Sequence, residues 1–559
     1  MEFVNSLFDF AGGYIGAGTG AISHAYGLPL NQLLTKEFIF SPPGFTLLIT
    51  LAVLYLSYTL LFPGLTLQED IVFDEELLDG FETVGVKKNL QLEDIPTLVE
   101  EMRLSFESGY TLPYSKRMEQ LKAMKRMFVE NEDAICAALK EDLNRPNFEG
   151  VVYDVLVPLG EINHTISHLK KWMQPKSKGF SLLTFPSQQW LQKEPMGVVC
   201  VIGSWNYPFM LSLVPVMGAI AAGNTVVLKP CNVSSACARL QVELVEKYMD
   251  PLVVSCVGPA IKGDRHTTAA LLEHRFDTIF FTGSPDVGKV IATGAAKFLT
   301  PCILELGGKN PVFVDSSADI SLAAKRTLWA RNMNAGQQCI SPDFAMVHED
   351  KVDEFCEACK GWIDTFFDGQ PAKESKDFGR IVGDGQVKRI QGMLKSHKGK
   401  VVCGGEVDAA ERYIAPTVIK VKVGSPGLED ETFGPILWVV AVKDMDAAIT
   451  YMQGRAKPLS QYIFAGDKKV VNRILQNTSA GGVTVNGCLF HCGHPDLPFG
   501  GIGNSGMGGY HGESSFNAFT HLKPVLDKAV WADGGLLSDP FVLYAPWTDF
   551  KLKVMRNMF

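Results

Sequence analysis

The stretch that decides the fold is "GVVCVIGSWNYPFMLSLVPVMGAIAAGNTVVLKP", residues 197–230. Two short apolar runs, 197–202 and 224–230, enclose an apolar segment of helical length, 210–223. Continuous apolar runs bounded by Gly, Pro or Asn are typical of strands that are buried on both faces. A strand, a helix and a second strand at this spacing predict a parallel sheet with helices on both sides.

The same α/β pattern extends in both directions along the chain. "EDAICAALKEDL" (132–143) and "YDVLVPLGEINHTISHLKKWM" (153–173) have apolar residues at helical spacing, and "FDTIFFTG" (276–283) reads as another buried strand. A second alternating region covers about 308–490, without repeats or low-complexity segments. A chain of 559 residues is too long for one small core, so we expect an α/β protein of two or more domains.

Charge and cysteine content narrow the class of protein. The net charge is -9 and no long basic run occurs, which argues against nucleic acid as a partner. The twelve cysteines are scattered without the framework of a small disulfide-bonded domain. Such cysteine usage in a long chain indicates a reducing compartment.

One segment differs in character from the rest of the chain. "FTLLITLAVLYLSYTLLF", residues 45–62, carries no charge, and its length at about 1.5 Å per residue approaches the thickness of a bilayer core. A buried core helix is the alternative, although core helices rarely lack charge on every face. A cleaved signal peptide fits poorly, because 44 residues precede the run. We therefore predict an amino-terminal segment (1–44), a transmembrane helix (45–62) and an acidic linker (63–91).

Two features after predicted strands are candidates for cofactor binding. In "FTGSPDVGKVIATGAAK" (281–297), Gly283 and Ser284 open a helix whose exposed N–H groups attract phosphate. The glycines do not form the usual dinucleotide fingerprint, and Gly283 and Gly288 could equally shape a turn. Lys229 stands at the carboxyl end of a predicted strand, where ligands of open α/β sheets bind. A solvated loop lysine is the alternative.

The candidate nucleophile is Cys339 in "NMNAGQQCISPDF", residues 332–344. A single cysteine is more often packing than chemistry, but small residues around this one would let backbone donors approach. It occurs with Asn206 in "WNYPF", Glu305 in "LELGGKNP" and Glu431 in "DETFGP". Together, in this order and with 34 residues between Glu305 and Cys339, the motifs resemble the aldehyde dehydrogenase superfamily. "GQQCISPDF" and "LPFGGIGNSGMGGYHG" are most similar to its class 3 and fatty aldehyde dehydrogenase branch.

The resemblance covers about residues 92–550 and implies a domain plan. It implies a Rossmann-like cofactor-binding domain over 92–306, with an oligomerisation hairpin near 180–194. A catalytic α/β domain would follow over 307–497, and an oligomerisation strand with a carboxyl-terminal tail over 498–559. A homodimer is expected from the resemblance.

The resemblance also implies the roles of individual residues. Cys339 would attack an aldehyde to give a thiohemiacetal, from which hydride leaves for a nicotinamide. Glu305 would activate the water that hydrolyses the thioester, and Asn206 would donate to the oxyanion. Glu431 would bind the nicotinamide ribose. The residues expected to bind the cofactor are Lys229, Asn232, Gly283, Ser284, Gly288, Glu431, Phe433 and Trp205.

The expected cofactor is NAD, and NADP stays open. Many family members have Glu three residues after the cofactor lysine, where this chain has Asn232. Asn can bond a ribose hydroxyl but does not repel a 2′-phosphate. We expect no metal, because the spacing in "CLFHCGH" (488–494) fits no standard zinc site. Cys356 and Cys359 in "DEFCEACKGW" are interpreted as helix packing.

The predicted anchor bears on substrate and location. A tethered enzyme meets lipophilic aldehydes at high local concentration, which favours medium- or long-chain aliphatic substrates. "NVS" begins at Asn232, where a glycan would block the cofactor, so we expect the body in the cytosol, on the endoplasmic reticulum. Because positively charged flanking residues favour the cytosolic side, Lys36 favours a cytosolic amino terminus by a margin of one residue. The alternatives are a semialdehyde dehydrogenase with a polar substrate and a catalytically silent membrane scaffold.

Overall fold

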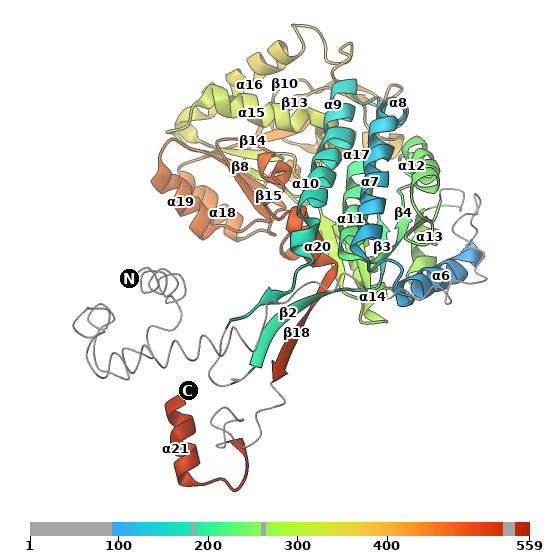
Figure 1. Ribbon diagram of the computed structural model, residues 1–559. Coiled ribbons are helices and arrows are strands. Elements are labelled where there is room, and N and C mark those ends of the chain that lie inside the picture. The colour runs from blue at the N-terminus through green and yellow to red at the C-terminus, as the bar shows by residue number, and fades with distance from the viewer. Residues whose placement is uncertain (1–91, 180–183, 185–186, 259–263, 529–542, 559) are drawn as a thin grey trace, which may run out of the picture. The chain divides into compact units, whose positions relative to one another are not determined.

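The computed structural model describes residues 92–179, 184, 187–258, 264–528 and 543–558 (Figure 1). The predicted segments 1–44, 45–62 and 63–91 lie outside the described residues. Among the helices in the described ranges, none has the length and apolar character needed to cross a bilayer. The chain divides into two compact units, the larger of which contains 92–176 and 191–524, and this larger unit holds both main sheets.

The first sheet confirms the strands predicted from the opening stretch. Its order is β17-β7-β6-β3-β4-β5, and all neighbours are parallel except β17 and β7. The strands are β3 (Val198–Ile202), β4 (Thr225–Lys229), β5 (Val254–Cys256), β6 (Thr278–Gly283), β7 (Cys302–Leu306) and β17 (Gly506–Met507). Because β3 is followed by β4 on one side and has β6 on the other, the strand order reverses at β3. Ligands of open α/β sheets bind at the carboxyl ends of strands beside such a reversal.

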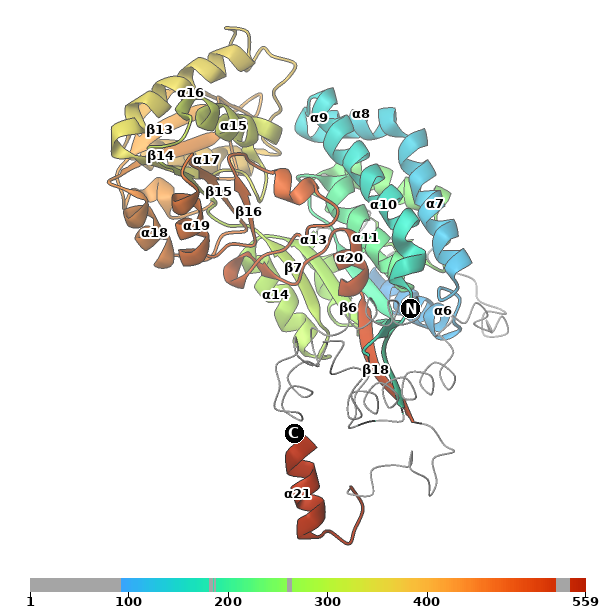
Figure 2. The same cartoon turned by 60° about the vertical axis from the view of Figure 1, so that its left-hand side comes forward.

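Helices cover both faces of this sheet. Successive side chains of β3 point to opposite faces, so burying all of them requires a core on each face. Val199 and Val201 belong to a core shared with α11 (Pro208–Ala222). Val198, Cys200 and Ile202 belong to the opposite core, shared with α6 (Ile95–Glu107) and α14 (Pro285–Ala296). Figure 2 shows α11 and α14 on either side of the strands. The remaining helices of this half are α7 (Tyr114–Glu130), α8 (Glu132–Leu143), α9 (Asn147–Val151), α10 (Val157–Trp172), α12 (Ser235–Tyr248), α13 (Asp264–Leu271) and α20 (Gly512–Ala518).

The helices predicted over 132–143 and 153–173 are confirmed as α8 and α10, with one difference at the start of the second. A π-helical turn occupies Val152–Leu156 before α10 begins. Its Asp154 is buried and accepts hydrogen bonds from the N–H groups of Phe209 and Met210, which begin α11. The turn therefore supplies the acceptor that the first turn of α11 lacks within its own helix.

The second sheet has the order β10-β13-β14-β9-β8-β15-β16 and is parallel except for β10. Its strands are β8 (Pro311–Val314), β9 (Phe344–His348), β10 (Lys400–Cys403), β13 (Thr417–Val421), β14 (Ile436–Val442), β15 (Ser460–Phe464) and β16 (Gly482–Val485). Its helices are α15 (Ile320–Asn332), α16 (Val352–Phe366), α17 (Asp384–Ser396), α18 (Met445–Gln453) and α19 (Lys468–Asn477). Cys356 and Cys359 are buried on α16, which confirms their interpretation as helix packing.

A third, smaller sheet has the order β1-β2-β18. Its strands are β1 (Lys176–Ser177), β2 (Ser187–Pro195) and β18 (Thr520–Lys528). The last described element is α21 (Asp549–Met558), which belongs to the smaller unit.

Candidate active site

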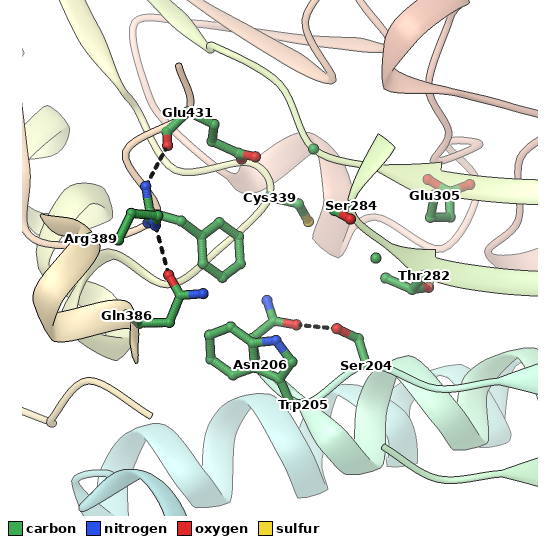
Figure 3. A pocket seen from close by; sticks show the side chains of 13 residues that line it. Ser204, Trp205, Asn206, Thr282, Ser284, Glu305, Cys339, Gln386, Arg389 and Glu431 are labelled. Carbon is green, nitrogen blue, oxygen red and sulfur yellow. Dashed lines mark hydrogen bonds between the residues drawn. The ribbon is translucent and has the colours of Figure 1, made fainter. Parts of the chain in front are cut away.

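A cavity of about 220 Å³ opens at the carboxyl ends of β3, β6 and β7 (Figure 3). Ser204, Trp205 and Asn206 follow β3, and Ser284 follows β6. Glu305 is the penultimate residue of strand β7, and Cys339 comes from the loop before β9. The complete lining is Ser204, Trp205, Asn206, Thr282, Gly283, Ser284, Glu305, Gly307, Cys339, Gln386, Arg389, Glu431 and Phe433.

The cavity brings together most of the residues predicted from the sequence. The predicted residues that line it are Cys339, Glu305, Asn206, Trp205, Gly283, Ser284, Glu431 and Phe433. Three predicted residues do not line it. Lys229 is buried at the end of β4, and Asn232 lies in the following turn. Gly288 lies in α14, where a Cβ would come within 2.7 Å of the Leu306 side chain, so it permits the packing of α14 on β7.

The sequence did not lead to five of the lining residues, Ser204, Thr282, Gly307, Gln386 and Arg389. Arg389 reaches the cavity from α17 and donates to the Gln386 side chain at 2.8 Å. It also donates to the carbonyl oxygens of Glu431 at 3.2 Å and Thr432 at 2.6 Å. The only local signal for this pair was its three-residue spacing, which places both side chains on one face of a helix.

A sharp turn presents Cys339 to the cavity. Asn334, Ala335 and Gly336 have positive φ angles of 49°, 50° and 76°. A Cβ on Gly336 would come within 2.3 Å of the Gly434 carbonyl oxygen, so only glycine fits there. The next residue, Gln337, donates to the carbonyls of Asn334 and Arg380 and accepts from the N–H of Val382. The glutamine that precedes the nucleophile by two positions therefore fixes the turn.

Asn206 faces the same turn from the opposite wall. Its side-chain amide donates to the Gln337 carbonyl at 3.1 Å, and its side-chain oxygen accepts from the Ser204 hydroxyl at 3.0 Å. Its own carbonyl accepts from Asn334 at 2.9 Å and from Arg145. The Asn206 amide thus presents a hydrogen-bond donor beside the Cys339 loop, and a donor of this kind can stabilise an oxyanion.

Glu305 is a buried carboxyl group whose two oxygens can still accept hydrogen bonds. It is 2% exposed, and neither side-chain oxygen has a hydrogen-bond partner among the described residues. Burial raises the pKa of Glu305 well above its ordinary value. In its ionised form, a carboxyl group with a raised pKa is a stronger base than an exposed one and can accept a proton from water or a thiol.

The surroundings of Cys339 favour the protonated form of its thiol. Burial raises its pKa above the ordinary value, and the nearby charges of Glu431 and Glu305 raise it further. The thiolate is the nucleophilic form of cysteine, so the site needs a route for the proton to leave. Glu305 lines the cavity, and neither of its oxygens has a hydrogen-bond partner among the described residues, so its carboxylate can accept this proton.

Glu431 lies across the cavity from Glu305, with Cys339 between the two in the view of Figure 3, and Phe433 also lines the cavity. Burial, followed by the charge of Asp343, raises the pKa of Glu431 to about 8. One Glu431 oxygen has no hydrogen-bond partner among the described residues. A Cβ on Gly307 would come within 2.2 Å of the other oxygen. The Phe433 ring packs edge-on to Trp205 at 5.4 Å.

These features fit a nicotinamide dinucleotide. An unpartnered carboxyl oxygen can accept from a ribose hydroxyl, and the two aromatic rings can flank a planar ring. Ser284 caps the amino end of α14, where N–H groups favour phosphate. No cluster of His, Cys, Asp and Glu suited to a metal ion occurs in the described parts of the chain. His491, in the stretch with Cys488 and Cys492, instead hydrogen-bonds to the Ser460 and Thr484 hydroxyls.

The comparisons with known proteins agree with this geometry. The model of the "Aldehyde dehydrogenase family" matches residues 81–525. The chain is 41% identical to mouse "Aldehyde dehydrogenase, dimeric NADP-preferring" over 440 residues, which is 78% of this chain and 96% of that protein. It is 40% identical to "Aldehyde dehydrogenase family 3 member H1" of Arabidopsis thaliana over 479 residues, covering 85% of this chain and 97% of the relative.

A solved structure extends the agreement to the fold. The structure described as the substrate-bound state of Staphylococcus aureus AldH has a TM-score of 0.78 and 35% sequence identity. The alignment covers 83% of this chain and 98% of that one. The chain belongs to the aldehyde dehydrogenase family, and it is an enzyme that oxidises an aldehyde with NAD or NADP as the hydride acceptor.

Proposed function

We propose that the enzyme oxidises medium- or long-chain aliphatic aldehydes to carboxylic acids, with Cys339 as the nucleophile. The observation that supports this assignment of roles is the meeting of Cys339, Glu305, Asn206 and Glu431 in one cavity, although they are up to 225 residues apart in the chain. The same set of intact groups argues against a catalytically silent scaffold.

In the first half of the reaction, Cys339 gives its proton to the Glu305 carboxylate, which passes it on to solvent, and the sulfur bonds to the aldehyde carbon. The carbonyl oxygen becomes an oxyanion, which accepts hydrogen bonds from the Asn206 amide and the Cys339 backbone N–H. Hydride then leaves the same carbon, and a thioester remains on Cys339. A bound nicotinamide supplies the acceptor for that hydride. Glu431 would hold the ribose next to it, with Phe433 and Trp205 beside the ring.

In the second half, Glu305 removes a proton from water, and the hydroxide adds to the thioester carbon. The tetrahedral adduct collapses, the carbon–sulfur bond breaks, and the carboxylic acid and the Cys339 thiolate separate. Burial of Glu305 suits it to this step, because a raised pKa makes a carboxylate a stronger base.

In this proposal, a domain over 92–306 binds the cofactor and a domain over 307–497 carries the nucleophile. Within the first domain, Lys229 and Asn232 would bind the adenosine ribose, and Gly283, Ser284 and Gly288 the pyrophosphate turn. Asn232 leaves room for a 2′-phosphate, and the mouse relative is called NADP-preferring. Comparing kcat/KM for NAD and NADP tests this point, and Asn232→Glu is expected to reduce the use of NADP more than that of NAD.

The substrate class is tested with straight-chain aldehydes of increasing length. Lipophilic substrates predict that kcat/KM rises with chain length, since each buried CH₂ contributes about 0.8 kcal/mol. A flat or falling series, with faster turnover of a polar semialdehyde, would instead support the biosynthetic alternative.

We further propose that residues 45–62 anchor the enzyme in the endoplasmic reticulum membrane with the catalytic body in the cytosol. The uncharged apolar segment and the chemistry of a reactive thiol support this location. Deleting 1–91 should move the protein from the membrane pellet to the supernatant without loss of activity in detergent. We also propose a homodimer, as in the relative called dimeric, to be measured by light scattering.

A further inference from the structure

A buried hydrogen-bond network joins the three chain segments that carry Glu305, Cys339 and Glu431. The Lys309 ammonium donates to the Asp343 carboxylate at 2.8 Å. Lys309 comes four residues after Glu305, and Asp343 comes four residues after Cys339. Both partners are nearly inaccessible to water, with side chains 9% and 1% exposed.

The same two residues hold the loop of Glu431. Asp343 accepts from the Thr432 N–H at 2.8 Å and from the Thr432 hydroxyl at 2.5 Å. Lys309 also donates to the carbonyl oxygens of Gly427 at 2.6 Å and Asp430 at 2.7 Å. Gly427, Asp430 and Thr432 are therefore tied to one ion pair, immediately beside Glu431.

The network also restrains a disfavoured backbone conformation at Phe433. Its φ angle is 44°, in the left-handed region that residues with a Cβ rarely adopt. Thr432, on one side, is held by Asp343, and Gly434, on the other, accepts from the buried Arg331 guanidinium. Such conformations persist where surrounding contacts determine them, and here the result is that the Phe433 ring faces Trp205 across the cavity.

We propose that Lys309, Asp343 and Thr432 form a clamp that positions Glu431 and Phe433 relative to Cys339, and that they are thereby positioning residues for the hydride-transfer step. The proposal rests on the proposed role of Glu431 at the nicotinamide ribose. None of the three clamp residues lines the cavity, so their effect on the reaction must pass through the loop that they hold.

The electrostatics of the clamp agree with this geometry. Burial alone would raise the pKa of Asp343, but Lys309 and Arg331 outweigh it, and the net pKa is lowered. Asp343 is therefore a carboxylate throughout the neutral range. Its charge in turn contributes to the raised pKa of Glu431.

The test uses the full-length enzyme with Thr432→Val, which keeps the shape of the side chain and removes the hydroxyl. We expect the Kd for NADH to rise and the kcat to fall, each by about tenfold to a hundredfold, in keeping with a displacement of about 1 Å at a reacting group. Alkylation of Cys339 by iodoacetamide without cofactor should stay within about twofold of the parent, because the nucleophile loop keeps its own contacts. Thr432→Ser, which retains the hydroxyl, should restore both parameters.

Asp343→Asn provides a second variant, and Asp277→Asn is the matched control. Asp277 also forms an ion pair, with Arg103 at 2.9 Å, and accepts from the Val198 N–H, but it is only partly buried and lies at the opposite ends of the strands. The proposal is overturned if Thr432→Val and Asp343→Asn bind NADH and turn over like the parent. It is also overturned if Asp277→Asn loses as much NADH affinity and kcat as these two variants. Glu431→Gln separates the role of Glu431 at the cofactor from the role of the clamp. If Glu431→Gln leaves the affinity for NADH unchanged, the proposed role of Glu431 is wrong. If Glu431→Gln weakens NADH binding strongly and Thr432→Val does not, only the clamp is rejected.

Discussion

The side-chain amide of Asn206 donates to the carbonyl of Gln337 at 3.1 Å, two residues before Cys339. The contact joins the loop after β3 to the turn of the nucleophile, so the proposed oxyanion donor and the sulfur are held together before any substrate binds. A neutral carbonyl is a weaker acceptor than an oxyanion. The amide is therefore expected to exchange Gln337 for the substrate oxygen as negative charge develops.

Replacing Asn206 should lower kcat more than it raises KM. Loss of one oxyanion donor typically costs about 10²- to 10³-fold in kcat, or about 3 to 4 kcal/mol. We expect this for Asn206→Ala, measured as NADH formation with a saturating aldehyde. Asn206→Asp, which keeps the size but lacks the amide donor, should be similarly slow. A kcat near that of the parent in both variants would contradict the assignment.

Cys339→Ala should abolish aldehyde oxidation and leave the Kd for NAD within about threefold of the parent, because a thiohemiacetal cannot form without the sulfur. Cys356→Ala is the matched control, since Cys356 is a buried thiol on α16 outside the cavity. Its turnover should remain close to that of the parent. Oxidation by Cys339→Ala at a measurable fraction of the parent rate would mean that another group is the nucleophile.

Glu305→Gln should separate the two halves of the reaction. The amide cannot remove a proton from water, so hydrolysis of the thioester becomes slow while hydride transfer can still occur. We expect a burst of NADH close to one equivalent per site, followed by slow turnover. Mass spectrometry of the quenched protein should find the acyl group on Cys339. Steady turnover without a burst at the parent rate would exclude Glu305 as the base.

The strands around the cavity could be predicted because the relevant signals are local. The runs that became β3, β4 and β6 are apolar and end at Gly, Pro or Lys, and these boundaries are visible within a few residues. Ser284 could be predicted for a related reason, because it follows the carboxyl end of a predicted parallel strand, where the topology of the sheet places ligands. Asn206 and Glu305 could be predicted from the resemblance of their motifs to those of aldehyde dehydrogenases.

What the sequence could not supply depends on packing between distant segments. Arg389 and Gln386 reach the cavity only because α17 packs beside the loop that contains Glu431. Lys309 and Asp343 are 34 residues apart, and nothing local distinguishes them from surface charges. The π turn at Val152–Leu156 is also invisible in the periodicity, since it depends on Asp154 meeting the start of α11.

Glu431 should weaken the fold at neutral pH, because its placement serves the cofactor. The folded-state pKa is about 8, whereas an unperturbed glutamate titrates near 4.5. At pH 7 the unfolded chain has released the proton that the folded protein still holds. The contribution of this group to stability is therefore fully present below about pH 4.5 and is lost as the pH rises through about 8. Burial is the main cause, and the neighbouring Asp343 carboxylate adds to it.

Glu431→Gln removes this titration, so the variant should gain in melting temperature over the parent as the pH rises. The free energy of unfolding should differ little between variant and parent near pH 5. The difference should grow up to pH 8, by no more than about 1.4 kcal/mol per pH unit, and stay constant above pH 8. Differential scanning fluorimetry across this range, with NADH affinity measured in parallel, should find a protein that is more stable and binds the cofactor less well. Glu429→Gln is the control, since Glu429 is exposed on the same loop and pairs with Arg455 at 3.5 Å. Equal shifts in the two variants, or a difference that shrinks with rising pH, would show that the carboxyl group of Glu431 is not held protonated by its surroundings.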